Sequence, residues 1–188
     1  MRHMLLNAEE AAGCLRRGQV IAYPTEAVFG LGCDPANETA VRNLLSLKQR
    51  PVEAGLILIG HSLQQFDGWV GEVSAQLRER AAESWPGPIT WLFPRGPLAA
   101  SFIVGRHETV AIRVIDHEPS RALCAAFGGP VVSTSANPRS AAPARSSGEV
   151  ESYFGNYIGG ILEGALGGRD QPSEIRDLAT GKVIRGGS

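Results

Sequence analysis

The stretch VIAYPTEAVFGLG, residues 20–32, carries the strongest structural signal in the chain. It begins with an apolar run that is typical of a buried strand, and the run stops at Pro24, Thr25 and Glu26. Because proline restricts the backbone, we expect a corner there that presents a hydroxyl and a carboxylate. The segment 29–32, Phe-Gly-Leu-Gly, has glycines that allow the backbone to approach another group closely. The alternative interpretation is a strand, a turn and an ordinary glycine-rich connection.

Apolar periodicity and helix-capping residues predict an alternation of helices and short strands around this stretch. The last strands are separated by too little chain for helical crossovers, so we expect an α/β fold with a mixed sheet. Residues 138–148 are the most loop-like part of the chain. The expected helices are 7–17, 37–50, 62–66, 74–84, 119–127 and 149–154, and the expected strands are 20–23, 55–60, 89–93, 109–115, 130–132, 158–162, 174–178 and 182–185.

Length and composition describe an ordinary globular protein. The chain has 188 residues, and we expect a single domain over residues 1–188 that buries a sizeable core. The formal net charge of −1 gives no bulk electrostatic attraction to nucleic acid or to an anionic membrane. Sixteen of the eighteen basic residues are arginines. Arginine offers a fixed fork of donors suited to phosphate and carboxylate, although genomic base composition can produce the same bias.

The cysteines and the N-terminus favour a cytoplasmic protein. Cys14, Cys33 and Cys124 are odd in number and lack C-x-x-C spacing, which indicates reduced thiols rather than a disulfide or zinc framework. The N-terminus has no apolar signal-peptide core, and no apolar stretch approaches the length of about 20 residues that a membrane span needs.

Several catalytic motifs are absent from the sequence. There is no G-x-x-x-x-G-K-[ST] phosphate loop and no G-x-S-x-G nucleophile elbow, and the four histidines have no metal-ligand spacing. We therefore do not expect covalent or metal-hydroxide catalysis. The remaining polar groups are cations and hydroxyls at strand ends, which are suited to holding anions.

Arg113 is anomalous within the expected strand 109–115. Strand alternation places it on the same face as Ala111 and Ile115. A guanidinium there is costly unless it is paired or faces a polar cleft, and costly charges often mark functional sites. The alternatives are a structural ion pair or an edge-strand face that is open to water.

Three other polar segments are candidates for ligand binding. Residues 133–137, Ser-Thr-Ser-Ala-Asn, follow an apolar strand, where open α/β sheets bind ligands, although a solvated turn is the alternative. Lys48 and Arg50 follow an expected helix, where cations also suit the helix dipole. Arg185 ends the last expected strand beside glycines, and an ordinary solvated arginine is the alternative there.

Eight segments in order carry a resemblance to a known family. They are AYPTEAVFGLGCD (22–34), LKQRP (47–51), GLILI (55–59), WPGPIT (85–90), VAIRVIDH (110–117), STSAN (133–137), GGRDQPSEIRD (167–177) and VIRGG (183–187). Together they resemble the YrdC/TsaC family of L-threonylcarbamoyladenylate synthases, in its short form without an extra C-terminal domain. The resemblance implies a twisted, open, mixed α/β sheet with flanking helices and a concave, electropositive ligand cleft.

The resemblance also implies a nucleotidyltransferase reaction. L-Threonine, bicarbonate and ATP would give threonylcarbamoyl-AMP and pyrophosphate, for the t6A37 modification of tRNA. ATP is then a substrate whose Mg²⁺ is carried mainly by the phosphates, and no metal site on the protein is expected. The implied partners are the proteins that transfer the product to tRNA, and tRNA or double-stranded RNA is a further candidate ligand.

Motif positions transfer two sets of contacts onto this chain. Lys48 and Arg50 are expected to hold the triphosphate and to act in catalysis, and Arg113 is expected to bind the carboxylate of threonine. The full threonine set is Thr25, Arg113, Ser135 and Ser173. The full ATP set is Lys48, Arg50, Thr109, Asn137, Arg145 or Ser146, and Arg185.

This chain departs from the family pattern at three places. Ala54 stands where relatives carry Lys or Asn, which removes one polar ATP contact. Pro138-Arg139-Ser140 follows STSAN where relatives often continue with a hydrophobic residue and Ser-Gly, so the loop is expected to close differently over the nucleotide. Some relatives also have a histidine near the position of Ile59, and this chain does not.

Two other functions remain as alternatives. One is an RNA-binding module that docks RNA in the concave face, against which stand the small net charge and the absence of an aromatic-basic run. The other is the YrdC-like domain of hydrogenase-maturation carbamoyltransferases, which acts on carbamoyl rather than threonine substrates. This chain lacks the extra domains that such proteins carry.

Overall fold

The stretch 20–32 folds as a hairpin of two buried strands. In the computed structural model, which describes residues 5–186, β2 (Ile21–Pro24) pairs antiparallel with β3 (Phe29–Gly32). The amide of Thr25 donates to the carbonyl of Val28 and closes the turn. The predicted strand and corner are confirmed, whereas the glycine segment is itself a strand and not a connection.

The glycines of β3 make room for an aromatic ring. The Tyr23 side chain lies against β3, and its hydroxyl donates to the carbonyl of Val132 at 3.2 Å. A Cβ atom added to Gly32 would lie 2.7 Å from Tyr23 Cε1 and 2.5 Å from Val132 O. A Cβ atom added to Gly30 would lie 3.1 Å from Tyr23 Cζ. The groups that approach these glycines closely are therefore the Tyr23 ring of the same hairpin and, at Gly32, the backbone carbonyl of Val132.

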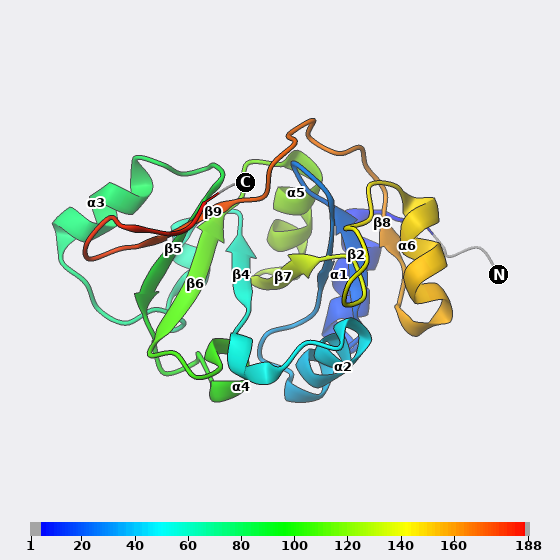
Figure 1. The fold of residues 1–188 in the computed structure, drawn as a ribbon, viewed down its shortest axis with the longest axis horizontal. Coiled ribbons are helices and arrows are strands. Elements are labelled where there is room, and N and C mark those ends of the chain that lie inside the picture. The colour runs from blue at the N-terminus through cyan, green and yellow to red at the C-terminus, as the bar shows by residue number, and fades with distance from the viewer. Residues whose placement is uncertain (1–4, 187–188) are drawn as a thin grey trace.

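The described strands form a single mixed sheet. The other strands are β1 (Leu5–Leu6), β4 (Ile57–Gly60), β5 (Ile89–Pro94), β6 (Thr109–Val114), β7 (Val131–Ser135), β8 (Ile161–Leu162), β9 (Glu174–Asp177) and β10 (Val183–Arg185). Their order is β1-β8-β2-β3-β7-β4-β6-β5-β9-β10. Figure 1 shows β8, β2, β7, β4 and β6 in their places along this order. The pairs β1–β8, β2–β8, β4–β6 and β5–β9 are parallel and the other pairs are antiparallel, which confirms the expected mixed α/β sheet.

The helices begin and end largely where the capping residues predict. Asn7 and Glu10 form a capping box at the first helix, and Gly128 ends the fifth in the left-handed region. The α-helices are α1 (Ala8–Arg16), α2 (Glu38–Lys48), α3 (Ala75–Ala82), α4 (Ser101–Val104), α5 (Glu118–Phe127) and α6 (Ser147–Phe154). Three 3₁₀ turns complete the set: η1 (Val52–Ala54), η2 (Leu63–Phe66) and η3 (Gly155–Tyr157).

Several elements of the structure differ from the sequence predictions. The segment 62–66 forms the 3₁₀ turn η2 rather than an α-helix, and the expected strand 158–162 is reduced to the two residues of β8. The elements β1 and α4 were not predicted, because two to four residues are too few to show a period. Residues 133–135 belong to β7 instead of following it, because β3 and β4 pair with them on either side.

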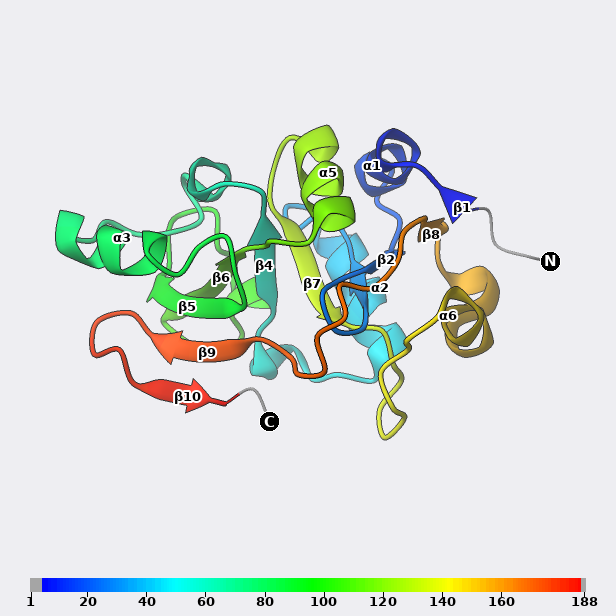
Figure 2. The same ribbon diagram turned by 90° about the horizontal axis from the view of Figure 1, so that it is seen from above.

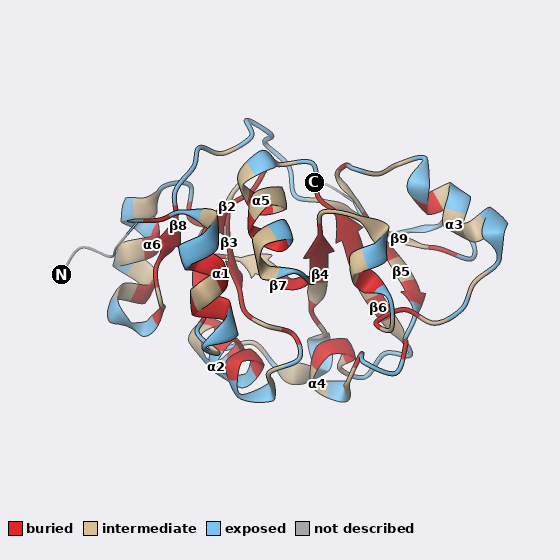
Figure 3. Ribbon diagram, turned by 180° about the vertical axis from the view of Figure 1, so that it is seen from behind, coloured by how far each residue is buried: buried red, intermediate tan, exposed pale blue. Residues whose placement is uncertain are grey.

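Each face of the sheet carries its own hydrophobic cluster. Tyr23, Ile59 and Val131 pack with α1 and α5 on one face. Figure 2 shows these two helices on the same side of the sheet. Ala22 and Leu58, the neighbours of these residues along β2 and β4, face the opposite cluster with buried residues of α2, α4 and α6. Strand alternation thus buries both faces of the central strands β2, β3 and β4, which are largely red in Figure 3.

The helix α5 covers only one end of its sheet face. Along β7, Val131 is fully buried in the α1–α5 cluster, whereas Ser133 and Ser135 on the same face are half-buried. Along β4, Ile59 is buried in this cluster and Ile57 is only partly covered. The uncovered end of this face is where a ligand can reach the sheet.

Some sequence predictions fall outside the described part of the chain. These include residues 1–4 at the start of the region searched for a signal peptide, and Gly187 at the end of the VIRGG segment. Within residues 5–186, no helix has both the length and the apolar character that a membrane crossing requires. Cys14, Cys33 and Cys124 are all buried and free, which agrees with the expected reduced thiols.

We expect the substitution Gly32→Ala to destabilise the protein by about 2–3 kcal/mol, because the added methyl group meets a backbone carbonyl and the Tyr23 ring that cannot both retreat. Urea unfolding measures this change. Gly148→Ala in α6 is the matched control, since its added Cβ meets nothing closer than 3.9 Å and should leave stability unchanged or slightly higher. Equal stability of the two variants would contradict the packing of Tyr23 on β3.

Candidate active site

A cleft of about 590 Å³ opens on the uncovered end of the sheet face. Its walls come from the β2–β3 turn, from β4, β6 and β7, from the loop 138–146 and from the segment between β8 and β9. Figure 1 shows this last segment, in orange, running from β8 across the top of the molecule to β9. Backbone hydrogen bonds from Gly167 to the carbonyl of Thr25, and from Arg169 to the carbonyl of Glu26, hold it against the β2–β3 turn.

Five arginines contribute to the lining of the cleft. Its lining includes Arg50, Arg113, Arg145, Arg169 and Arg185, and only two carboxylates, those of Glu26 and Asp170. Such an excess of guanidinium groups favours phosphate and carboxylate ligands. The expected electropositive cleft is therefore present, although the net charge of the whole chain is −1.

Arg50 and Arg185 are held partly out of water. Burial lowers the pKa of both side chains, and the nearby Arg50 guanidinium adds to the effect at Arg185. Arg50 Nη2 donates to the carbonyl of Gly55 at 2.9 Å, while its Nε is buried without a partner. Arg185 Nη2 donates weakly to the carbonyl of Ser173 at 3.3 Å. A bound anion would offset the desolvation of both guanidinium groups.

Arg113 forms a buried ion pair and also faces the cleft. Its Nη1 lies 3.1 Å from Glu26 Oε1, and the two residues are 7% and 9% exposed. Arg113 Nε is buried without a partner, and no described residue accepts a hydrogen bond from Nη2. The structural ion pair that was an alternative for Arg113 is thus present. It occupies one side of the guanidinium and leaves donors for a ligand.

The three hydroxyls predicted to bind threonine all line the cleft. Thr25 Oγ1 donates to the carbonyl of Val28 at 2.7 Å, which fixes the corner after β2. Ser135 Oγ donates to Asn137 Oδ1 at 2.6 Å. Ser173 Oγ accepts from Thr90 Oγ1 at 3.1 Å. Each hydroxyl retains lone pairs or a rotatable hydrogen with which to contact a ligand.

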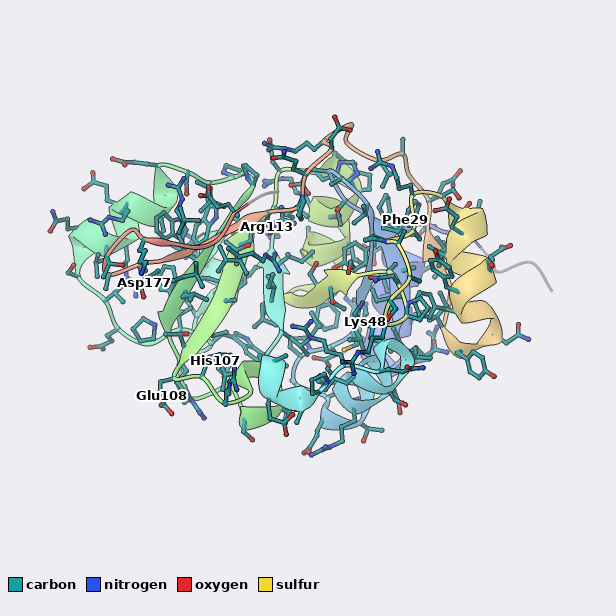
Figure 4. All side chains as sticks on the ribbon, viewed as in Figure 1. Phe29, Lys48, His107, Glu108, Arg113 and Asp177 are labelled. Carbon is teal, nitrogen blue, oxygen red and sulfur yellow. The ribbon has the colours of Figure 1, made fainter. Side chains whose placement is uncertain are left out.

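Lys48 does not line the cleft, although the sequence predicted that it binds the triphosphate. Its Nζ donates to the carbonyls of Ser135 and Asn137 and to Asn137 Oδ1. Burial, assisted by the charge of Arg50, lowers the pKa of Lys48 to about 8. Figure 4 shows Lys48 beside α2 and Arg113 near the upper end of β6. In this geometry Lys48 fixes the end of β7 rather than reaching the cavity.

Three further predicted ATP contacts also lie outside the cleft lining. Ser146 caps α6, accepting from the amide of Glu149, and Thr109 pairs with Pro94 at the end of β6 that is remote from Arg113. Asn137 belongs to the network of Lys48 and donates to the carbonyls of Pro138 and Ala141. The predicted residues that the structure does bring together are Thr25, Arg50, Arg113, Ser135, Arg145, Ser173 and Arg185.

The sequence-based site omitted Glu26 and Arg169, which also line the cleft. In the sequence, the feature that could have indicated Glu26 as a site residue is its place in the corner after the first buried strand. Arg169 lies in the GGRDQPSEIRD segment, and only the crossing of this segment over the β2–β3 turn brings it to the cleft. Among residues 5–186, no group of three or more His, Cys, Asp or Glu side chains could hold a metal ion.

The fold and this cleft define an α/β domain that binds small anionic ligands at the uncovered end of a mixed sheet. Comparison with known proteins makes the assignment specific. The family model Sua5_yciO_yrdC, described as "Telomere recombination", matches residues 13–187. The chain belongs to this Sua5/YciO/YrdC family.

Relatives match almost the whole chain. A protein of Cellvibrio japonicus named "Threonylcarbamoyl-AMP synthase" is 53% identical over 175 residues, which cover 93% of each chain. One of Pseudomonas savastanoi pv. phaseolicola with the same name is 54% identical over 179 residues, covering 95% of this chain and 96% of the relative. The crystal structure of P. abyssi Sua5 complexed with L-threonine has a TM-score of 0.86 and 30% identity, covering 94% of this chain and 52% of that longer one.

The pKa of Lys48 predicts a specific pH dependence of stability. In the unfolded chain a lysine titrates near pH 10.4, as ordinary lysines do, whereas in the folded protein Lys48 titrates at about 8. Below pH 8 the ammonium group is charged in both states, and its burial costs the folded state in full. As the pH rises from about 8 to about 10, the folded protein releases this proton first, so the stability of wild type relative to Lys48→Met should rise. Urea unfolding of both proteins across this range measures the difference, and a flat or falling difference would contradict the burial of the charge.

Proposed function

We infer that this chain is a threonylcarbamoyl-AMP synthase, which forms L-threonylcarbamoyladenylate and pyrophosphate from L-threonine, bicarbonate and ATP. The observation that carries this inference is the near-complete match to relatives of that name, at more than half identity. The arginine-lined cleft supplies the matching chemistry, because every substrate carries a carboxylate, carbonate or phosphate group. The enzyme is a transferase of the nucleotidyl type, and its product serves t6A modification of tRNA.

The reaction requires positioning and charge neutralisation rather than a protein nucleophile. The amine of threonine combines with the carbon of bicarbonate to give a carbamate. An oxygen of the carbamate then attacks the α-phosphate of ATP, and pyrophosphate leaves. Negative charge accumulates on phosphate oxygens during this attack, and guanidinium groups fixed in a cleft stabilise it without reorganising. We propose that Mg²⁺ enters on the phosphates of ATP, since it needs few protein ligands in that position.

The side chains of the cleft can be assigned to the two larger substrates, ATP and threonine. Arg50, Arg145 and Arg185 would hold ATP, and the lowered pKa values of Arg50 and Arg185 mark them as partly desolvated cations that an anion would stabilise. Arg113 would hold the carboxylate of threonine. Thr25, Ser135 and Ser173 would contact the rest of the amino acid.

Lys48 and Asn137 receive a different role from the one that the sequence predicted. Their hydrogen bonds converge on the end of β7, where Lys48 Nζ and Ser135 Oγ both bond to Asn137 Oδ1. Lys48 would therefore act through Ser135 and the STSAN segment as a positioning residue.

We further propose that the product passes to tRNA through separate transfer proteins and that the reaction takes place in the cytoplasm. The alternative of an RNA-binding module has less support from the geometry. Arg113 is 7% exposed and engaged with Glu26, so a polynucleotide backbone could not reach it without displacing the walls of the cleft.

Pyrophosphate release from ATP by the purified protein tests the reaction, with threonine and bicarbonate each present or omitted. The synthase requires both for release. Release with bicarbonate but without threonine would instead support a different carbamoylation substrate, as in the hydrogenase-maturation alternative. No release, combined with retained RNA binding, would support the RNA-binding module.

The substitution Arg50→Ala should lower kcat/KM for ATP by about 10- to 100-fold, because it removes a charge-assisted contact to the triphosphate. Arg42→Ala is the matched control: Arg42 lies on α2, pairs only with the exposed Glu38 among residues 5–186, and has a side chain that is 62% exposed. Steady-state pyrophosphate release at varied ATP measures both. An unchanged ATP dependence in Arg50→Ala would remove Arg50 from the ATP site.

A further inference from the structure

The α-ammonium group of threonine has no partner among the residues assigned so far. An amino acid binds as a zwitterion, so a site that holds its carboxylate on an arginine also needs an acceptor for the adjacent ammonium group. This requirement rests on the proposed function, because it assumes that threonine is the substrate. Of the two carboxylates that line the cleft, Asp170 is exposed on the segment between β8 and β9, and Glu26 is 9% exposed.

Only one oxygen of Glu26 is engaged. Oε1 accepts from Arg113 Nη1 at 3.1 Å and from the amide of Asp116 at 3.4 Å. No residue in the described range 5–186 donates to Oε2, and this atom is not among the fully buried atoms without a partner. Oε2 is therefore not fully enclosed, and since Glu26 lines the cleft its lone pairs are available for a ligand.

The position of Glu26 is fixed by the backbone. It follows Pro24 and Thr25 at the β2–β3 turn, the hydroxyl of Thr25 bonds across the turn, and the carbonyl of Glu26 accepts from the amide of Arg169. A carboxylate held so rigidly beside a cavity is preorganised for a ligand and loses little conformational freedom on binding.

We propose that Glu26 binds the α-ammonium group of threonine through Oε2 and accepts the proton that this group must lose before it reacts. The carboxylate and ammonium groups of an α-amino acid are attached to the same carbon atom. Arg113 and Glu26 are also close to each other, since 3.1 Å separates Nη1 from Oε1. A threonine whose carboxylate contacts Arg113 therefore presents its nitrogen to Glu26.

The proton balance of the reaction requires a group that accepts a proton from the threonine nitrogen, and the carboxylate of Glu26 is suited to this role. An ammonium group has no lone pair with which to attack carbon. When Glu26 takes one proton, the nitrogen forms a bond to the carbon of bicarbonate, and one C–O bond of bicarbonate breaks so that water leaves. Threonine and bicarbonate together give the carbamate, one water and one proton. The proton leaves Glu26 for the water of the open cleft, which restores the carboxylate.

A pair of ligands separates this role from a structural role for Glu26. Isothermal titration calorimetry compares L-threonine with the hydroxy acid that carries a hydroxyl in place of the α-amino group. In Glu26→Gln, the affinity for L-threonine should fall by about 10- to 100-fold, because a charge-assisted hydrogen bond is lost. The affinity for the hydroxy acid should change far less. A purely structural loss would weaken both ligands equally, and thermal unfolding of the variant shows whether it is folded.

The catalytic part of the proposal is tested at saturating threonine. There kcat of Glu26→Gln should be lower by about 100-fold or more, since an amide cannot accept the proton, and Glu26→Asp should recover part of the rate because it keeps a carboxylate. Glu38→Gln is the matched control for loss of one negative charge, because Glu38 is an exposed carboxylate of α2 outside the cleft lining, and it should resemble wild type. A kcat in Glu26→Gln equal to that of wild type would overturn the role in proton transfer.

Failure of this inference and failure of the proposed function give different results. Normal synthase turnover in wild type, together with an undiminished preference of Glu26→Gln for threonine over the hydroxy acid, would overturn the role of Glu26 and leave the function standing. Threonine binding that depends on Glu26, without pyrophosphate release by wild type, would support the ammonium site and overturn the function. A wild-type protein that binds neither ligand would overturn both.

Discussion

The ion pair between Arg113 and Glu26 connects the two parts of the molecule that build the cleft. Arg113 comes from β6 in the middle of the sheet, and Glu26 comes from the turn that ends β2. Removing two charges from water is costly, and a buried pair of this kind seldom stabilises a fold more than apolar residues would. Its value here is geometric, because it holds a cation and an anion side by side in a cavity that must receive a zwitterion.

The cleft exists because α1 and α5 leave one end of their sheet face uncovered. The helix α5 and its neighbour α1 bury Val131 and Ile59, and beyond them the same strands present Ser133, Ser135 and the partly covered Ile57. The strand alternation that makes the core thus also delivers polar side chains to the cleft floor. A single strand, β7, belongs to the core at one end and to the site at the other.

Two buried side chains, Tyr23 and Lys48, hold the strand β7 that forms the floor of the cleft. Tyr23 lies on the glycines of β3 and reaches the backbone of β7 through its hydroxyl. Lys48 approaches β7 from the end of α2 and binds its last carbonyl together with Asn137. Both side chains are buried, and both fix the strand that carries the serines. The arginines of the site therefore line the cleft, whereas Lys48 bonds to the end of β7.

The sequence by itself determined most of the secondary structure and the chemical character of the site. Apolar runs, capping residues and glycines marked nearly all the longer elements, because these signals act within a few residues of the chain. The ordered motifs, from AYPTEAVFGLGCD to VIRGG, also identified the family. They predicted Arg50, Arg113 and Arg185 as anion-binding residues, and all three line the cleft. The short elements β1 and α4 had no detectable period.

Only the tertiary structure decided which side chains share the cleft. Glu26 and Arg113 are 87 residues apart in the chain, and so are Lys48 and Ser135. Nothing local to Lys48 shows that its ammonium group bonds to the end of β7. Nothing local to Glu26 shows that one of its oxygens has no donor among residues 5–186. The strand order and the crossing of the segment before β9 determine these outcomes, since they bring distant residues together and set which direction from each side chain remains open.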